Sequence, residues 1–415
     1  MKFNESVTEV EYNNFIKNKS EVTFLQTPEF GKLKASKGNR NVDYFLVGVE
    51  NDKKELLSVA MLLFFKNNKI KNIYCSRGPI ADYFNEEIMN CFLEGVYQLA
   101  KKHKADVIDI EPDYVVRELD NKFNVTKENQ HLDFVFEKNK FKHRGYFGQI
   151  PGFQLRFTVL FDLNSSYEDI AKKYENDKKK IINRNNKYFK IKIVESEQDD
   201  IKDLVKYRDV LSKRKNFYLD EDDYYKKCYE LFNEHHKALY IRAIANFTDM
   251  IVDIEKEINE MENTLKNNPK NITDLKNQKE SLEQKLMEIK KFKEDNNIKN
   301  EYCLGAGMAI IVNGNITYLY EHTDKNNNFG VPTLMSDYLL RYGTNNKHKS
   351  FDFLGIINPK LKNTSNMGVN SFKTSFGGNI VEHIGVYSRS VSKLYNLKKL
   401  AKKIYYKLRG RIYEE

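Results

Sequence analysis

The chain has 415 residues, of which 40% are hydrophobic and 13% aromatic, so a wholly disordered protein is excluded and two or three domains can be expected. Its net charge of +10 favours a polyanionic partner: nucleic acid, a phosphorylated substrate or an anionic membrane surface. The four cysteines form no Cys-x-x-Cys pair, and the start of the chain lacks the apolar core of a signal peptide. We therefore expect a reduced, cytoplasmic protein with no zinc site, no disulfide framework and no membrane span.

The N-terminal third of the chain has the pattern of a mixed α/β unit. Apolar and β-branched runs predict strands over 44–50, 56–65 and 72–78. Residues 86–104 carry apolar side chains every three or four positions, which predicts an amphipathic helix, and a further strand is expected over 106–112.

A lopsided basic segment follows a strand predicted over 153–163. Only Glu175 and Asp177 oppose its positive charge, and such a run is either a solvated helix face or an anion-binding surface. Its nine basic residues are Lys172, Lys173, Lys178, Lys179, Lys180, Arg184, Lys187, Lys190 and Lys192.

Residues 249–298 change character after a strand predicted over 238–247. Apolar residues recur there with the three-and-four spacing of a coiled-coil seam, interrupted at Asn267–Asn271, where Pro269 ends a helix. This pattern predicts an antiparallel helical hairpin inserted between strands, either as a projecting arm or as an oligomerisation element. The seam residues are Ile251, Ile254, Ile258, Met261 and Leu265, then Leu275, Leu282, Leu286 and Ile289.

A weak internal repeat links the two ends of the chain. Residues 98–112 resemble residues 340–356, because each segment runs from an apolar helix through a His-Lys pair into a strand that contains Asp109 or Asp352. Strands predicted over 307–312 and 316–322 precede the second copy. The repeat suggests two copies of one α/β unit.

The segment SFKTSFGGNIVEHIGVY places Lys373 near the end of a short helix. Phe372 and Phe376 share a helix face, Gly377 and Gly378 form a stop, and a strand pattern begins at Ile380. The simplest interpretation of Lys373 is a solvated lysine that stabilises the negative end of the helix. The alternative is a functional cation.

A second short motif, SRGPIADY, follows the strand predicted at 72–78. Arg77-Gly78-Pro79 predicts a rigid turn, and its simplest interpretation is structural, with an exposed arginine.

Over nearly its whole length the chain resembles the Fem-type peptidoglycan bridge aminoacyltransferase family in the order of its motifs. These motifs are FLQTPEFGKLKASKG, SRGPIADY, the basic segment, the inserted hairpin and FKTSFGGNIVEHIG. The resemblance implies an α/β (α+β) fold of two tandem GNAT-like domains with an antiparallel coiled-coil hairpin inserted in the second. The domains would be 1–147, then 148–247 with 300–390, with the arm at 248–299 and a basic C-terminal helix at 391–415.

The resemblance also implies roles for individual residues. Lys34 matches the lysine that holds substrate phosphates, and Arg214 falls where some members keep a second phosphate-binding arginine. Lys373 matches the lysine credited with stabilising the tetrahedral oxyanion. Arg77 joins the substrate-binding set, and so does Glu111, although members often have Asp at that position.

The implied reaction moves an amino acid from aminoacyl-tRNA to the side-chain amine of the stem peptide in lipid II or its soluble precursor. The ester supplies the activation, so we expect no cofactor, metal or covalent enzyme nucleophile. A cation near the reacting carbonyl stabilises the developing oxyanion. The alternatives are a non-catalytic tRNA- or membrane-binding scaffold and another aminoacyl transferase on the same fold. The expected partners include the anionic inner face of the cell membrane, and homo- or heterodimers with related transferases are left open.

Overall fold

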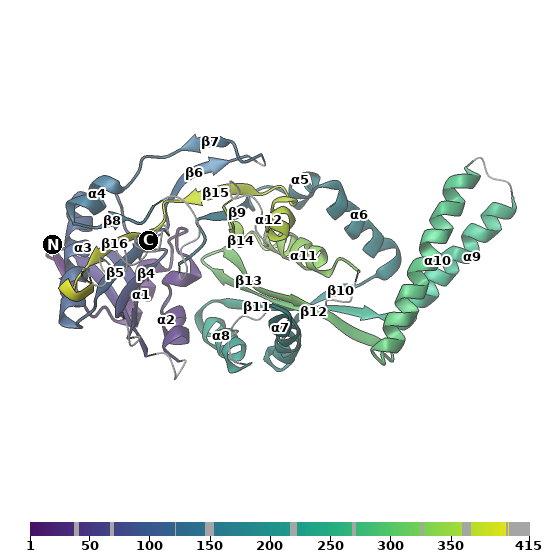
Figure 1. Cartoon of the computed structure of the whole chain (residues 1–415), viewed down its shortest axis with the longest axis horizontal. Coiled ribbons are helices and arrows are strands. Elements are labelled where there is room, and N and C mark those ends of the chain that lie inside the picture. Colours follow the sequence, from purple (N-terminus) through teal and green to yellow (C-terminus); the bar gives the residue numbers. More distant parts are fainter. Residues whose placement is uncertain are drawn as a thin grey trace, which may run out of the picture.

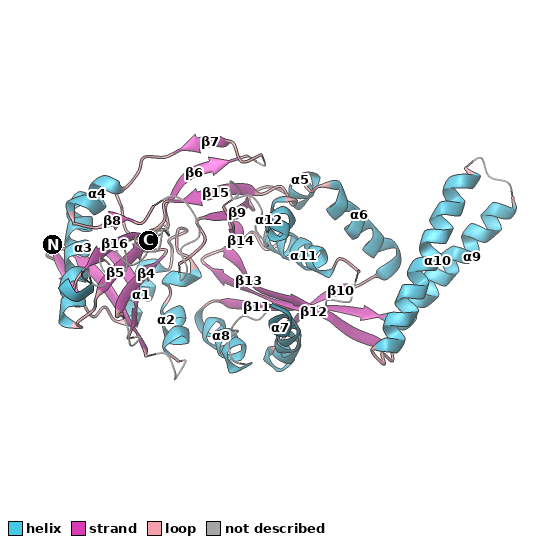
Figure 2. Cartoon of the chain, viewed as in Figure 1, coloured by secondary structure: helices cyan, strands magenta, loops and turns pink. Residues whose placement is uncertain are grey.

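The computed structural model describes residues 1–36, 41–66, 70–120, 122–145, 153–215, 222–267, 271–324, 328–358, 367–395 and 397, without the side chains of 209–215 and 222. In this part of the chain the strands form two mixed sheets, as the α/β class predicts (Figure 2). The first sheet has the order β1 (Lys2–Asn4), β2 (Val42–Glu50), β3 (Leu56–Phe65), β4 (Asn72–Ser76), β5 (Val107–Glu111), β16 (Tyr387–Ser390) and β8 (Lys142–His143). The second has the order β10 (Lys192–Ser196), β11 (Lys237–Asn246), β12 (Glu301–Val312), β13 (Asn315–Thr323), β14 (Ser350–Ile356), β9 (Phe157–Asp162), β15 (Asn379–His383), β6 (Val115–Leu119) and β7 (Val125–Glu128).

Helices cover the faces of both sheets. Figure 1 shows α5, α6, α11 and α12 on one side of the second sheet and α7 and α8 on the other. The helices are α1 (Glu9–Ile16), α2 (Pro28–Ala35), α3 (Glu86–Lys102), α4 (Asp133–Lys138), α5 (Tyr167–Lys172), α6 (Asn176–Arg184), α7 (Lys202–Lys215), α8 (Asp222–His235), α9 (Phe247–Lys266), α10 (Ile272–Asp295), α11 (Val331–Asn345) and α12 (Met367–Thr374). No helix in the described residues is both long enough and apolar enough to cross a bilayer.

The internal repeat corresponds to a repeated unit of structure. In the first sheet, α3 connects β4 to the parallel strand β5, and in the second, α11 connects β13 to the parallel strand β14. Both parallel pairs follow an antiparallel meander.

The two copies differ in how far their parallel strands stay paired. β4 and β5 pair over five positions, from Asn72 with Val107 to Ser76 with Glu111. β13 and β14 pair only over Asn315–Thr317 and Ser350–Asp352, although both strands continue beyond that point. The second sheet therefore opens between β13 and β14, whereas the first stays closed.

The chain exchanges strands between the sheets. β6 and β7 follow the first repeat in sequence but belong to the second sheet, where β6 pairs with β15 and β7 pairs with β6. Conversely, β16, near the C-terminal end, pairs with β5 and β8 of the first sheet. One apolar cluster spans the two halves: Met61 and Tyr74 of the first sheet pack in it with Tyr240 and Met308 of the second and Phe232 of α8. The exchange and this shared core hold the halves together.

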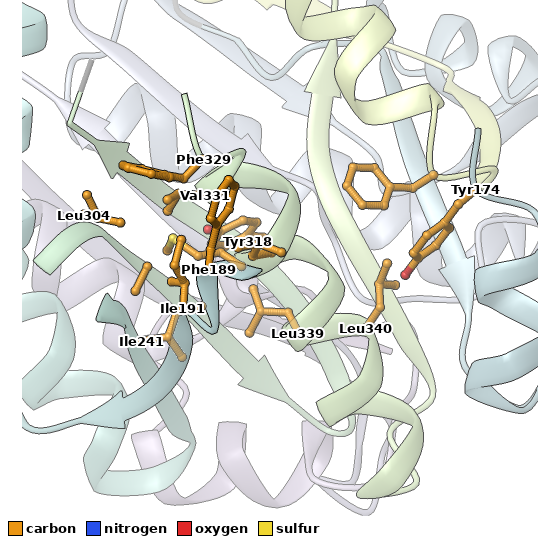
Figure 3. Close-up of a cluster of buried hydrophobic side chains, with 14 of the residues drawn as sticks. Tyr174, Phe189, Ile191, Ile241, Leu304, Tyr318, Phe329, Val331, Leu339 and Leu340 are labelled. Atoms are coloured by element: carbon orange, nitrogen blue, oxygen red, sulfur yellow. The ribbon is translucent and has the colours of Figure 1, made fainter. Parts of the chain in front are cut away.

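The core of the second half lies between its sheet and α11. Figure 3 shows Leu339 of α11 near Tyr318 of β13, and Leu340 of the same helix beside Tyr174. The core extends to the base of the arm, where the rings of Phe247 and Phe292 stack at 5.5 Å.

The inserted segment forms α9 and α10, which project from the long strands β11 and β12 (Figure 1). The predicted seam packs between the two helices: Ile254, Ile258 and Met261 are buried against Leu282 and Ile289. Ion pairs cross the hairpin, including Lys290 with Glu255 at 2.6 Å. The assignment as a true coiled coil stays a prediction.

The basic segment is not one helix. α5 ends at Lys172, α6 begins at Asn176, and a π-helical turn, η2 (Asn185–Phe189), follows. Lys187 and Lys190 form ion pairs with Glu257 and Asp253 of α9, at 2.7 and 2.5 Å. Part of its positive charge therefore fixes the base of the arm.

Candidate functional site

Lys373 lies in the last turn of α12 and points into the protein. Its half-buried side chain places Nζ 2.9 Å from the carbonyl oxygen of Gly355 and 3.4 Å from that of Leu354, both in β14. Burial lowers the pKa of Lys373, and the negative charges of Asp352 and Glu321 partly oppose that shift. The interpretation as a solvated surface lysine is therefore wrong.

The local structure around Lys373 follows the sequence pattern. Gly377 has a φ of +79°, which favours glycine and ends the helix, and β15 begins at Asn379. The rings of Phe372 and Phe376 contact a cation from another helix. Lys178 Nζ, of α6, lies 4.8 Å from the ring centroid of Phe372 and 5.7 Å from that of Phe376.

The backbone of β14 is distorted where it meets Lys373. Leu354 has a φ of +61°, a left-handed conformation that costs a bulky residue roughly 1–3 kcal/mol, and the pairing with β9 is irregular between Asp352 and Gly355. The Asp352 carboxylate supports this bend by accepting hydrogen bonds from the Leu354 amide, at 2.7 Å, and from the Thr158 hydroxyl. The distortion lets two consecutive carbonyls face the ammonium of Lys373.

Two acidic side chains that the sequence did not single out as site residues surround this lysine. Burial raises the pKa of Asp352, and the hydrogen bond from Thr158 opposes that shift. Burial raises the pKa of Glu321 to about 7, although a hydrogen bond with the Tyr318 hydroxyl and the positive charge of Lys373 both lower it. The position of Asp352 in the internal repeat was the one available signal, whereas Glu321 lies in an ordinary strand pattern.

Arg77 and Glu111 form a second, buried group at the end of β4 and β5. The guanidinium of Arg77 donates to the Leu155 carbonyl at 2.8 Å, and Glu111 accepts from the Tyr74 hydroxyl and, at 3.3 Å, from the Gln154 amide. Burial raises the pKa of Glu111, and Arg77 opposes it. The structural interpretation of this turn assumed an exposed arginine, but the Arg77 side chain is only 8% accessible. These contacts fix the start of the segment leading to β9, which favours a positioning role for both residues.

Lys34 lies apart from these groups, on α2. Its Nζ is 3.0 Å from the hydroxyl of Tyr224 in α8 and 5.2 Å from the ring centroids of Phe30 and Tyr224. Arg214 belongs to α7, but its side chain lies outside the described residues, so its assignment as a phosphate ligand stays a prediction.

A cavity of about 200 Å³ opens between the two halves. Asp352, Asp113 and His383 line it. The Oδ1 atom of Asp113 lies 3.3 Å from Nδ1 of His383. Burial and the charge of Arg77 lower the pKa of His383, although Asp113 and Asp352 raise it. Its imidazole is therefore neutral at pH 7. The sequence analysis missed Asp113 and His383, since nothing local relates two residues 270 positions apart.

One cluster of the described residues has the composition of a metal site. Ligand atoms of Glu9, Glu29 and His235 lie within 4.8 Å of one another. Lys32 Nζ already contacts Glu9 at 2.5 Å, so an ammonium group supplies the positive charge there.

The comparisons with known proteins agree over nearly the whole chain. The model of the FemAB family matches residues 7–403. The chain is 26% identical over 430 residues to the aminoacyltransferase FemA of Staphylococcus epidermidis, covering 97% of this chain and 100% of that protein. It is 24% identical over 420 residues to FemA of Staphylococcus aureus, covering 95% and 96%. A crystal structure of FemX superposes with a TM-score of 0.74 at 20% identity, covering 96% of this chain and 99% of that one, which shows a shared fold.

Proposed function

Because the chain belongs to the FemAB family and is an aminoacyltransferase of peptidoglycan bridge formation, we propose that its donor is aminoacyl-tRNA and its acceptor a stem-peptide side-chain amine. The acceptor is carried by lipid II or its soluble precursor. In this reaction the neutral amine attacks the ester carbonyl and a tetrahedral oxyanion forms. Its collapse breaks the bond to the ribose oxygen of the tRNA, which leaves as a hydroxyl with the proton that the amine gives up.

The observation that carries the proposal is the setting of Lys373. An ammonium group has three N–H donors, and the described acceptors are the two carbonyls of β14, which leaves a donor for a developing oxyanion. Asp352 and Glu321 act on Lys373 through their charges, but no ion pair of the described residues includes it. Such a fixed, partly desolvated cation stabilises the transition state more than the ground state.

The donor ester fits the opening between β13 and β14. Beyond Thr317 and Asp352 the two strands no longer hydrogen-bond to each other, and Lys373 contacts the diverging part of β14. Backbone groups freed from a sheet can bind a substrate in an extended conformation. We place the ester carbonyl at this opening, within reach of the ammonium.

The test combines purified protein, aminoacyl-tRNAs carrying different labelled amino acids, and either lipid II or its soluble precursor. We expect label to move to the precursor from one class of tRNA, without ATP. Labelled protein instead of labelled precursor would favour another aminoacyl transferase on this fold, and tRNA binding without transfer would favour the scaffold.

A further inference from the structure

The proposed reaction moves a proton as well as an amino acid. The amine loses a proton when its nitrogen bonds to the ester carbon, and the ribose oxygen gains one when it leaves. A side chain that carries this proton must lie beside the oxyanion, which we place at Lys373. Two carboxylates act on the ammonium of Lys373 through their charges, those of Asp352 and Glu321. They are the candidates for this role.

Asp352 already has a structural task in β14. Its carboxylate accepts hydrogen bonds from the Leu354 amide, at 2.7 Å, and from the Thr158 hydroxyl. These bonds support the bend that faces two carbonyls toward Lys373, so a proton on Asp352 would weaken it. Among the described residues, the groups that lower the pKa of Glu321 are a hydroxyl and an ammonium, and no backbone amide is one of them. Glu321 can therefore gain and lose a proton without disturbing a strand.

A β-bulge decides which way Glu321 faces. The register between β13 and β12 shifts so that Leu319 has no partner in β12. Tyr318, before the bulge, pairs with Ala309. Glu321, after the bulge, pairs with Gly307, two residues from that partner. Residues two apart in a strand share a face, so the bulge brings Tyr318 and Glu321 to the same face of the sheet.

That face is the one on which Lys373 lies. Tyr318 belongs to the core beneath α11, and Figure 1 shows α11 and α12 on the same side of the second sheet. Gly307 leaves room for the Tyr318 hydroxyl beside Glu321, because a Cβ atom at Gly307 would lie 2.7 Å from that hydroxyl. Glu321 itself is half-buried, so its carboxylate is partly withdrawn from water and still within reach of a ligand. It lies in the part of β13 that no longer pairs with β14.

The charges in the site balance if Glu321 takes the proton of the amine. Before the attack, the negative charge near Lys373 is on the carboxylate of Glu321. After the nitrogen has bonded to the ester carbon and given up its proton, Glu321 is neutral and the negative charge is on the oxyanion. One charge has moved from one neighbour of the ammonium to another, so no net charge is created in a partly desolvated site.

We propose that Glu321 is the proton carrier of the transfer, the general base for the attacking amine and the general acid for the departing ribose oxygen. When the intermediate collapses, the electron pair of the ester bond goes to the ribose oxygen, the carboxylic acid protonates that oxygen, and the carboxylate is restored. Tyr318 is a positioning residue, whose hydroxyl orients the carboxylate. The proposal rests on the proposed function, since it assigns one step of that reaction.

The test compares wild type with Glu321→Gln in single-turnover transfer from aminoacyl-tRNA to the soluble stem-peptide precursor. We expect the ratio of the wild-type rate to the variant rate to be about 10² at pH 8, at the lower end of what a general base contributes. The ratio should be roughly tenfold smaller at pH 6, because the pKa of Glu321 is about 7 and most of the wild-type carboxylate is then protonated. Titration of the substrates cancels in this ratio, since both proteins use the same substrates. A purely structural role would give a ratio that does not depend on pH.

Two further variants complete the design. Glu301→Gln, at an exposed carboxylate at the start of β12, is the matched control, and its rate should equal that of wild type at both pH values. Tyr318→Phe removes the hydroxyl that lowers the pKa of Glu321, so it should slow transfer more at pH 6 than at pH 8. Denaturant unfolding of each variant confirms that it is folded.

The two proposals fail separately. Absence of transfer by wild type overturns the proposed function. Transfer by wild type, with Glu321→Gln within threefold of it at pH 8 or slowed equally at both pH values, overturns the role of Glu321 alone. If Glu321→Gln does not fold, Tyr318→Phe decides the question, because equal slowing at pH 6 and pH 8, or none, overturns the role of Glu321.

Discussion

Replacing Lys373 by methionine is the most direct perturbation of the proposed chemistry. Methionine keeps an unbranched, flexible side chain of similar length and removes only the ammonium group. The carbonyls of Leu354 and Gly355 lose their partner, but burial of the ammonium is also relieved. Because these effects oppose each other, we expect the free energy of unfolding to change by no more than about 1 kcal/mol.

The effect on catalysis should be far larger. Loss of one oxyanion donor typically lowers kcat by about 10²- to 10³-fold, or about 2.7–4 kcal/mol. Lys373 belongs at the upper part of this range, because its charge is partly desolvated and no described carboxylate forms a contact ion pair with it. Affinity for the precursor should change little, since the interaction develops mainly in the transition state.

The assay is single-turnover transfer of a labelled amino acid from tRNA to the soluble precursor, with chemical denaturation of each variant to confirm folding. Lys53→Met is the matched control, because Lys53 is exposed in the turn between β2 and β3. A Lys373→Met protein that is folded and transfers within threefold of wild type would refute the role of Lys373 as the oxyanion cation.

Three further predictions can be tested with the same protein. The pKa of Glu321 in the folded chain, about 7, lies above the ordinary glutamate value of 4.5, so the folded chain binds more protons between these values and stability falls as pH rises through that window. Glu321→Gln should therefore match wild type in denaturant unfolding at pH 4 and exceed it at pH 8 by at most about 3 kcal/mol; equal stability at both would contradict the burial argument. Lys34→Ala and Arg214→Ala should each weaken precursor binding by about 1.5–3 kcal/mol, measured by titration. Unaltered affinity in both variants would contradict the assignment of these residues as phosphate ligands. The basic tail, predicted as a helix over 391–415, lies largely outside the described residues, but Val391 and Ser392 hydrogen-bond to Asp106, so a truncation after Tyr395 preserves that contact. At roughly 1 kcal/mol for each engaged basic residue, this truncation should abolish co-sedimentation with anionic vesicles and leave tRNA affinity intact, and the reverse pattern would assign the tail to tRNA.

The secondary structure around the site could be predicted because it depends on local periodicity. The helix that became α3, the two helices of the arm and the helix–glycine–strand turn after Lys373 all repeat at intervals of two to four residues, which one stretch of chain specifies by itself. The internal repeat predicted two copies of one unit because each copy has the same local order of elements. The family resemblance added the roles of Lys34, Arg214 and Lys373, which periodicity alone could not supply.

What only the tertiary structure decided depends on residues far apart in the chain. The opening between β13 and β14 exists because their pairing stops at Thr317 and Asp352, and neither strand carries a local signal for that end. The burial of Arg77 depends on a carbonyl 78 residues away, and Lys178, not Lys373, lies over the rings of Phe372 and Phe376 because a separate helix packs there. Asp113 and His383 meet because β6 pairs with β15 across the exchange between sheets. Side-chain burial and charge proximity are set by packing, so the sequence by itself determined which elements form, and the packing of those elements determined which of their side chains can act together.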